Sequence, residues 1–346
     1  MAGTAPQIAR RALPATGGVL GFDFHLGGRA PQLIEVNANP GGLLVALELA
    51  QAASAGCDCH TAPLPKLAAA GIELNRVASR FAESLRAKWV RSTGAEPLRT
   101  IAIVDDDPSA QYLHPEFLLC RNLLERAGWR VLIADPAALS VDVEVLRCRG
   151  EQVDLVNNRM TDFYFADVRH AVVRQACVRD LAVVTPHPAA HARWADKRLL
   201  AWLREESMLA AAGRDAAEQL AVLEAMPPTA IVDRSNAADL WARRKTPFFK
   251  PIDGFAGKAA YRGDKLTRAT FGRILAPRYV AQAIAPTSMR RICSAEGTET
   301  DLRADVRNFA MHGKIWLRTA RLYRGQTTNF RTAGGGFAPL LSLGVD

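Results

Sequence analysis

The sequence predicts a mixed α/β and α+β protein with more than one domain. Between residues 99 and 185, buried-type strands alternate with helices of about 10–15 residues, the pattern of a parallel sheet with crossover helices. Residues 42–90 read as helices, and residues after 246 read as strands joined by glycine-containing turns. At 346 residues, the chain is long enough for two or three domains that each bury a core.

The first segment, GFDFHLGGRAPQLIEVNANPGG at residues 21–42, carries oxygen ligands on two short strands. One apolar run contains Asp23, and the next ends in Glu35, Asn37 and Asn39 before Pro40. Glu35 and Asn37 are two apart and therefore share a strand face. Carboxylate and amide oxygens suit Mg²⁺, so we expect Asp23, Glu35 and Asn37 to be metal ligands and Asn39 to contact substrate. Hairpin-turn chemistry, in which Asn and Asp are frequent, is the alternative.

The region 98–190 contains the strands RTIAIV, WRVLIA, DLV and LAVVTP, with two amphipathic helices between them. In open parallel sheets, ligands bind at the carboxyl ends of the strands. DDDP (105–108) and NNRMTD (157–162) lie at such ends, so Arg159 and Asp162 are candidate substrate contacts. For DDDP itself we favour a helix-capping turn over a cation site.

The region after residue 192 begins with an expected helix, HARWADKRLLAWLREE (191–206), and continues into FFKPIDGFAGK (248–258). The second segment predicts a strand that delivers Lys250 and a turn with Gly254 and Gly257. Glycines let such a turn lie close over phosphates, with backbone N–H groups and lysines facing the anion. The spacing is not that of a P-loop, and a surface glycine turn is the alternative.

Three later segments add polar side chains to apolar strands. YVAQAIAP (279–286) has a single amide, Gln282, where the strand enters a loop, as in a hinge that binds an adenine edge. DVRNF (305–309) and LRTARLY (317–323) read as adjacent strands with Asp and Arg at alternating positions. TTNFRTAGGG places Asn329 and Arg331 before three glycines. A solvent-facing sheet is the alternative for any one of these segments.

Taken in order, these segments resemble the glutathione-synthetase-like ATP-grasp ligases over residues 195–336. FFKPIDGFAGK resembles the family's Lys-Pro-x-Asp-Gly-x-Gly-Gly loop, with Ala256 in place of one glycine. The resemblance implies that ATP is held by Lys197, Lys250, Asp253, Gly254, Gly257, Lys258, Gln282 and Ala283. It also implies that Arg307, Arg321 and Asn329 are catalytic, with Arg331 a further candidate substrate contact.

The resemblance also implies a circular permutation. In the family, an Asp strand and a Glu-x-Asn strand follow the arginine strands, whereas here they open the chain. We therefore expect strands at 17–24 and 32–37 to lie beside strands at 304–311 and 315–323. The expected domains are a permuted C-terminal part of the ATP-grasp fold (1–92), a small inserted Rossmann-like pre-ATP-grasp domain (98–190) and the main ATP-grasp domain (193–346).

The function implied by the resemblance is an ATP-dependent carboxylate–amine ligase that works through an acyl phosphate with Mg²⁺. Its substrates would be a small carboxylate and a small amine. Two alternatives stay open: a nucleotide-binding regulatory protein without ligase activity, and an ATP-grasp kinase that phosphorylates a hydroxyl group.

Composition argues against other classes of function. The net charge is +9, but the arginines are dispersed and not interleaved with aromatic residues, so we expect no nucleic-acid partner. The sequence has no apolar run long enough for a membrane span, and its first twenty residues lack a secretory signal, so we expect a cytoplasmic protein. Neither CDCH (57–60) nor the pair His187 and His191 is expected to bind metal. The start of a helix after Pro188 explains the two histidines better. A homodimer is left open.

Overall fold

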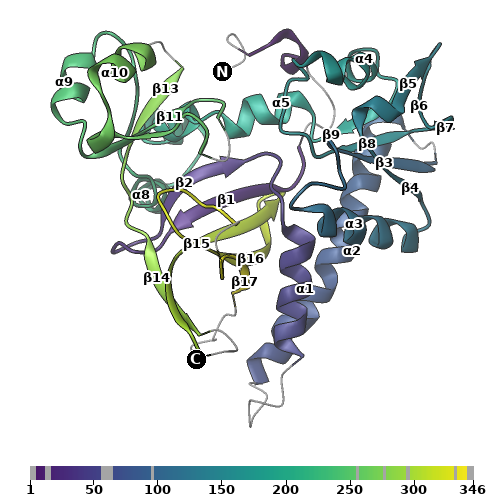
Figure 1. Cartoon of the computed structure of the whole chain (residues 1–346), viewed down its shortest axis with the longest axis horizontal. Coiled ribbons are helices and arrows are strands. Elements are labelled where there is room, and N and C mark those ends of the chain that lie inside the picture. The colour runs from purple at the N-terminus through teal and green to yellow at the C-terminus, as the bar shows by residue number, and fades with distance from the viewer. Residues whose placement is uncertain are drawn as a thin grey trace.

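Three main β-sheets organise the chain, as the computed structural model in Figure 1 shows. The structure describes residues 5–11, 17–55, 65–94, 97–254, 257–275, 278–293, 297–330 and 333–340, with side chains from residue 74 onward in the helix that begins at Pro65. Among the described residues, no helix is both long and apolar enough to cross a membrane.

The largest sheet is antiparallel and joins the two ends of the chain. Its order is β17-β16-β15-β1-β2, and β14 also pairs with β15. Asp23 and Arg307 are cross-strand partners although they lie 284 positions apart in the sequence. In Figure 1 the purple hairpin β1–β2 lies beside the yellow strands β15 and β16, so the expected adjacency of these segments is confirmed. The strands are β1 (Leu20–His25), β2 (Gln32–Asn37), β14 (Ser288–Cys293), β15 (Glu299–Met311), β16 (Lys314–Tyr323) and β17 (Gly336–Pro339).

The second sheet is fully parallel, as the alternating pattern predicted. Its order is β4-β3-β8-β9, with strands β3 (Thr100–Val104), β4 (Arg130–Ala134), β8 (Leu155–Asn158) and β9 (Val183–Thr185). The crossover helices are α3 (His114–Arg126) and α4 (Ala171–Val178).

A small antiparallel sheet in the β4–β8 connection was not predicted. It consists of β5 (Leu139–Asp142), β6 (Val145–Cys148) and β7 (Glu151–Gln152). Its turns contain Val143 and Arg149 at positive φ (52° and 50°). Neither residue type is a usual turn signal, although Gly150, which follows Arg149 and also has a positive φ, is one.

The third sheet has the order β10-β13-β11-β12 and carries helices α9 and α10. Its core contains Leu240, Phe249, Phe271 and Ala281. The elements are β10 (Thr229–Ile231), α9 (Ala237–Ala242), β11 (Pro247–Pro251), β12 (Tyr261–Arg262), α10 (Arg268–Ile274) and β13 (Tyr279–Ala283).

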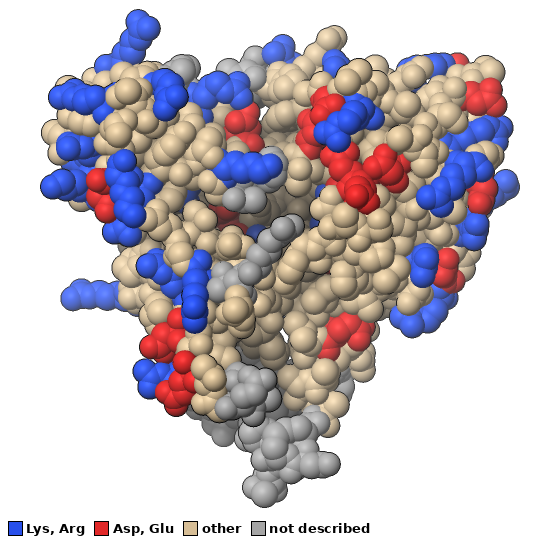
Figure 2. All heavy atoms as spheres, in the orientation of Figure 1, with Lys and Arg blue, Asp and Glu red and all other residues tan. Residues whose placement is uncertain are grey.

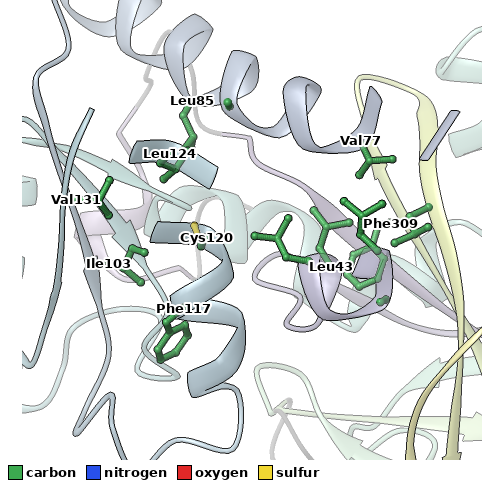
Figure 3. Close-up of a cluster of buried hydrophobic side chains, with 14 of the residues drawn as sticks. Leu43, Val77, Leu85, Ile103, Phe117, Cys120, Leu124, Val131 and Phe309 are labelled. Atoms are coloured by element: carbon green, nitrogen blue, oxygen red, sulfur yellow. The ribbon is translucent and has the colours of Figure 1, made fainter. Parts of the chain in front are cut away.

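One hydrophobic core connects the large sheet to the parallel sheet through helices α1 (Leu43–Ser54) and α2 (Pro65–Thr93). Figure 3 shows Leu43 of α1, Leu85 of α2, Ile103 of β3, Phe117 of α3 and Phe309 of β15 within this cluster. The core therefore runs across the domain boundary expected at residues 92–98. The division into three domains stays a prediction.

The helix expected at residues 191–206 is interrupted. Short α5 (Pro188–Ala190) leads into a π-helical turn at His191–Ala195, Asp196 is extended, and α6 (Arg198–Trp202) begins after it. The backbone N–H of Lys197 donates to the carbonyl of Ile252 at 3.0 Å instead of to a helical carbonyl. Because of this break, the backbone of Lys197 lies beside Ile252, the residue that follows β11. Helices α7 (Glu206–Ala211) and α8 (Ala216–Ala225) follow.

Two capping predictions have different outcomes. His187 accepts from the backbone N–H of Ala189 at 3.0 Å through its Nδ1, so the predicted role at a helix start is confirmed. DDDP caps no helix, because α3 begins only at His114 with Leu113 at its N-cap, so that prediction is wrong.

Candidate functional site

A cavity of about 470 Å³ lies between the large sheet and the β10–β13–β11–β12 sheet. Figure 2 shows the molecule hollowed near its centre, beside the lobe that carries α9 and α10. Eleven of the residues predicted for the site line this cavity: Glu35, Asn37, Lys197, Lys250, Gly254, Gly257, Lys258, Gln282, Ala283, Arg307 and Arg321. Segments from the start, middle and end of the chain thus meet at one place.

A buried quartet of charges forms the floor of this region on one face of the large sheet. The strand register places Asp23 opposite Arg307 and Asp305 opposite Arg321. Arg307 donates to Asp23 at 2.7 and 2.8 Å, and Arg321 contacts both Asp305 (2.5 Å) and Asp23 (3.0 Å). Two carboxylates and two guanidinium groups balance, so the quartet adds no net charge to the cavity.

The quartet holds Asp23 in ion pairs with two arginines, an arrangement that sequence analysis did not predict. Burial alone would raise the pKa of Asp23, but the charges of Arg307 and Arg321 outweigh burial and hold that pKa below its usual value. Asn37 donates to the same carboxylate at 3.0 Å. Both oxygens of Asp23 are therefore engaged within the protein, and its role as a metal ligand stays a prediction.

Glu35 is the carboxylate that faces the cavity. Its Oε1 lies 3.1 Å from Nζ of Lys197, which also donates to the carbonyl of Gly254 at 2.6 Å. Lys250 donates to Oε1 of Gln282 at 2.7 Å and to the carbonyl of Ile34 at 3.1 Å. Burial lowers the pKa of Lys250 to about 8, although the charge of Glu35 opposes this effect.

Cationic side chains outnumber carboxylates along the cavity wall. Besides the quartet's arginines, the wall includes Lys197, Lys250, Lys258, Arg262 and Arg303 against Glu35. Gln282 is 2% exposed, and its Nε2 has no partner among the described residues. Because a buried N–H without an acceptor is costly, the cavity is suited to a ligand that carries negative charge and hydrogen-bond acceptors.

The hinge prediction needs a correction in detail. The backbone N–H of Ala283 already donates to Pro228 at 2.7 Å, and that of Ile284 donates to Thr246 at 3.2 Å. These two N–H groups are therefore not available to an adenine edge. The nearby wall is apolar, with Ile34, Phe248 and Ala285, so the buried amide of Gln282 is the better candidate for a polar contact with a base.

Steric constraints explain why glycine occupies two positions in the loop after β11. A Cβ on Gly254 would lie 2.3 Å from Cγ of Pro251, and Gly257 has φ +70° against the side chain of Thr327. Asp253 lies outside the cavity wall and forms a surface ion pair with Arg278. The assignment of Asp253 as a nucleotide contact stays a prediction.

The remaining predicted residues lie elsewhere. Asn329 is exposed and outside the cavity wall, and Arg331 falls outside the described residues. Arg159 donates to Oδ1 of Asn39 at 2.5 Å and so ties the parallel sheet to the end of β2. Asp162 accepts from the ring of His170, whose other nitrogen lies 2.8 Å from Asp106. Arg159, Asn39 and Asp162 are thus held by internal contacts, and none of them lines this cavity.

Among the polar residues of this region, sequence analysis gave no role to His25, Arg303 and Thr328, and it treated Asp305 only as one polar position of its strand. Asp305 sits two residues before Arg307, and His25 two residues after Asp23, so strand alternation could have identified both. Thr328, which is not part of the quartet, donates to Oδ2 of Asp305 at 2.9 Å. That contact has no signal in the sequence.

The donor atoms fit a magnesium ion only in part. Among the described residues, no group of three or more His, Cys, Asp and Glu side chains could hold a metal; CDCH (57–60) lies outside that set. Glu35 and Asn37 both line the cavity. Mg²⁺ commonly takes one or two protein ligands and completes its shell with phosphate oxygens and water, so these two residues suffice for an ion that arrives with a nucleotide.

Comparisons with known proteins give the fold. No protein-family model matches the sequence, and no curated protein matches it significantly. A glutathione synthetase-like effector from Globodera pallida superposes with a TM-score of 0.57 at 12% identity, covering 96% of this chain and 77% of that one. A putative gamma-glutamylcysteine synthetase from Methylobacillus flagellatus gives 0.56 at 11% identity, covering 94% and 80%. The chain therefore shares the fold of the glutathione-synthetase-like proteins, as the resemblance of its motifs predicted.

Proposed function

We propose that the protein is an ATP-dependent ligase that joins a carboxylate to an amine. The observation that carries the proposal is the cavity in which Lys197, Lys250 and Arg303 converge beside Glu35 and next to an apolar wall. A triphosphate suits the cationic side, and a purine suits the apolar side with the unpartnered amide of Gln282. The two fold relatives are named as synthetase or synthetase-like proteins, which favours ligation over other uses of ATP.

Lys197 and Lys250 are the phosphate contacts in this proposal. Each has its ammonium group in the cavity wall and is held by carbonyl or amide oxygens that a phosphate oxygen can replace. Glu35 and Asn37 would hold Mg²⁺ on the phosphate chain, where the ion supplies charge neutralisation. Asp23, in contrast, orients the arginines.

Arg307 and Arg321 would stabilise negative charge on the transferring phosphoryl group. Their side chains line the cavity, and Asp23 and Asp305 fix their orientation before any ligand binds. Donors that are already oriented need no reorganisation in the transition state, which is the main route to electrostatic catalysis. The carboxylate substrate would take the γ-phosphate, and the amine would then displace phosphate from the acyl phosphate.

We further propose that the chain is a circular permutation of this fold, with domains at 1–92, 98–190 and 193–346. The support is that β1 and β2, from the start of the chain, complete the sheet formed by β15–β17 near its end.

Isothermal titration calorimetry with ATP tests the site. Lys250→Ala removes a charge-assisted contact, so binding should weaken by about 1.5–3 kcal/mol, or roughly 10- to 150-fold. Lys314→Ala, which changes an exposed lysine at the start of β16, is the matched control and should leave affinity unchanged. Equal ATP affinity in both variants would remove Lys250 from the site.

Hydroxylamine trapping tests the reaction type. With a panel of small carboxylates, an acyl phosphate yields a hydroxamate only when ATP is present. ATP-dependent phosphorylation of a hydroxyl compound without hydroxamate formation would show a kinase instead.

A further inference from the structure

A second cavity, of about 60 Å³, lies where the ends of the large sheet, the parallel sheet and helices α1, α2 and α3 meet. Its wall is mostly apolar, and Figure 3 shows Leu43, Leu85, Ile103 and Phe117 in the core cluster that surrounds it. A water molecule needs only about 10–15 Å³ on this measure, so the space is large enough for a ligand of a few heavy atoms.

Lys88 of α2 is one of three charged residues in this wall, with Glu116 and Arg159. Its side chain is buried (4% exposed), and Nζ donates to Oγ1 of Thr185 at 2.6 Å. Within the part of the chain that the structure describes, no carboxylate lies within ion-pair distance of it. Burial lowers the pKa of Lys88 to about 7, and the charge of Arg91 acts in the same direction. A lysine ammonium has three donors, and this one uses a single donor on a hydroxyl group.

The other polar groups of the wall are already used. The carboxylate of Glu116 accepts from the backbone N–H groups of Gly42 at 2.6 Å and Leu44 at 3.2 Å. Arg159 is bound to Asn39 and Pro40. Burial raises the pKa of Cys120 to about 12, so its thiol is neutral. Glu116 and Arg159 thus each make two hydrogen bonds to neighbouring polar groups, whereas Lys88 makes one, to a hydroxyl group.

The small cavity adjoins the proposed nucleotide site. Its wall includes Ala38, Asn39 and Pro40, which directly follow Asn37 of the larger cavity. Arg307 of the quartet donates to the carbonyl of Gly41 at 3.3 Å, in the same stretch of chain. A molecule bound in the small cavity is thus separated from the larger one by the end of β2.

We propose that the small cavity binds a short aliphatic carboxylate, with the carboxylate on Lys88 and Thr185 and the carbon chain against the apolar wall. A carboxylate supplies the charge and the acceptors that Lys88 lacks, and the volume limits the group to a few carbons. We assign this carboxylate to the ligase substrate, as the group that anchors it, and this assignment rests on the proposed function. The binding of a short carboxylate in the cavity does not rest on it.

The test is the thermal stability of the full chain in the absence of nucleotide. Propionate is titrated against propionamide, its neutral isostere, and against chloride at equal ionic strength. Above its dissociation constant, propionate should raise the melting temperature in proportion to the logarithm of its concentration, whereas the amide and chloride should not raise it. In Lys88→Met, which keeps the length and removes the charge, the apparent affinity should fall at least about tenfold. This variant should fold, since it replaces a buried ammonium by an apolar side chain.

Thr185→Val is the second variant and should weaken the response less than Lys88→Met. A propionate response that persists in Lys88→Met, or an equal response to propionamide, would overturn the proposal. No rise in melting temperature specific to propionate would overturn it as well, because the cavity would then hold only water. ATP calorimetry on the same protein separates the two ideas: ATP binding without a propionate effect removes only the carboxylate site, and the reverse result removes only the nucleotide site.

Discussion

Asp23 and Glu35 are cross-strand partners in the β1–β2 hairpin, yet their surroundings differ. The side chain of Asp23 is 1% exposed and is held by Arg307 and Arg321. The side chain of Glu35 is 26% exposed, lines the cavity and contacts Lys197 alone among the ion pairs of the described residues. The carboxylate of Asp23 is therefore held in buried ion pairs, whereas that of Glu35, its partner on the neighbouring strand, faces the cavity.

The physical reason is the cost of leaving a buried charge unpaired. Removing one member of a buried ion pair typically costs about 3–5 kcal/mol, whereas exposed pairs contribute about 0–1 kcal/mol. Asp23 cannot exchange its arginines for a metal without that cost. Glu35, at the cavity surface, can exchange Lys197 for a cation that arrives with a ligand. Substitutions of Asp23, Val36, Asp253 and Glu35 test this difference.

The largest effect is expected for Asp23→Asn. This change leaves Arg307 and Arg321 with one carboxylate, Asp305, so the free energy of unfolding should fall by about 3–5 kcal/mol in a urea titration. Asp301→Asn, in the surface pair with Arg291, is the control and should cost at most about 1 kcal/mol. Similar losses in the two variants would show that the quartet does not stabilise the fold.

A smaller effect is expected for Val36→Asn, between Glu35 and Asn37. Val36 is buried in a cluster with Leu33, Leu200 and Met226. An amide there lacks hydrogen-bond partners, so the unfolding free energy should fall by about 1–3 kcal/mol. ATP affinity should be normal in the fraction that remains folded. Unchanged stability would mean that Val36 does not face the core.

The smallest effect is expected for Asp253→Asn. Its pair with Arg278 is exposed and lies outside the cavity wall, so stability should change by at most about 1 kcal/mol and ATP affinity should not change. Calorimetry with ATP checks this expectation. A tenfold loss of ATP affinity would show that Asp253 contacts the nucleotide, as the sequence suggested.

The strands were predictable from local sequence patterns, and the pairing of β1 with β15 was predictable only from the resemblance to a known family. Alternation of polar and apolar residues located β1, β2, β15 and β16, and the order of the motifs predicted that they share a sheet. The convergence of Lys197, Lys250 and Glu35 on one cavity followed from the same resemblance.

The role of Asp23 was not predictable, because it depends on the register between strands far apart in the sequence. That register places Arg307 directly opposite. A shift in the β1–β2 register after Asp23 also alters which residues of β2 meet the cavity, and Ile34 lines it as a result. The break before Lys197 is set by its hydrogen bond to Ile252, a tertiary contact that helical periodicity cannot show.

The most direct test of the contrast between the two carboxylates is Glu35→Gln, with stability and turnover measured on the same sample. The change keeps the size and removes the charge that would offset Mg²⁺. We expect magnesium-dependent ATP consumption to be lost while the free energy of unfolding stays within about 1 kcal/mol of the unaltered protein, because Glu35 is 26% exposed and Lys197 keeps the carbonyl of Gly254 as an acceptor. Normal magnesium-dependent ATP consumption in a normally folded Glu35→Gln protein would contradict the account.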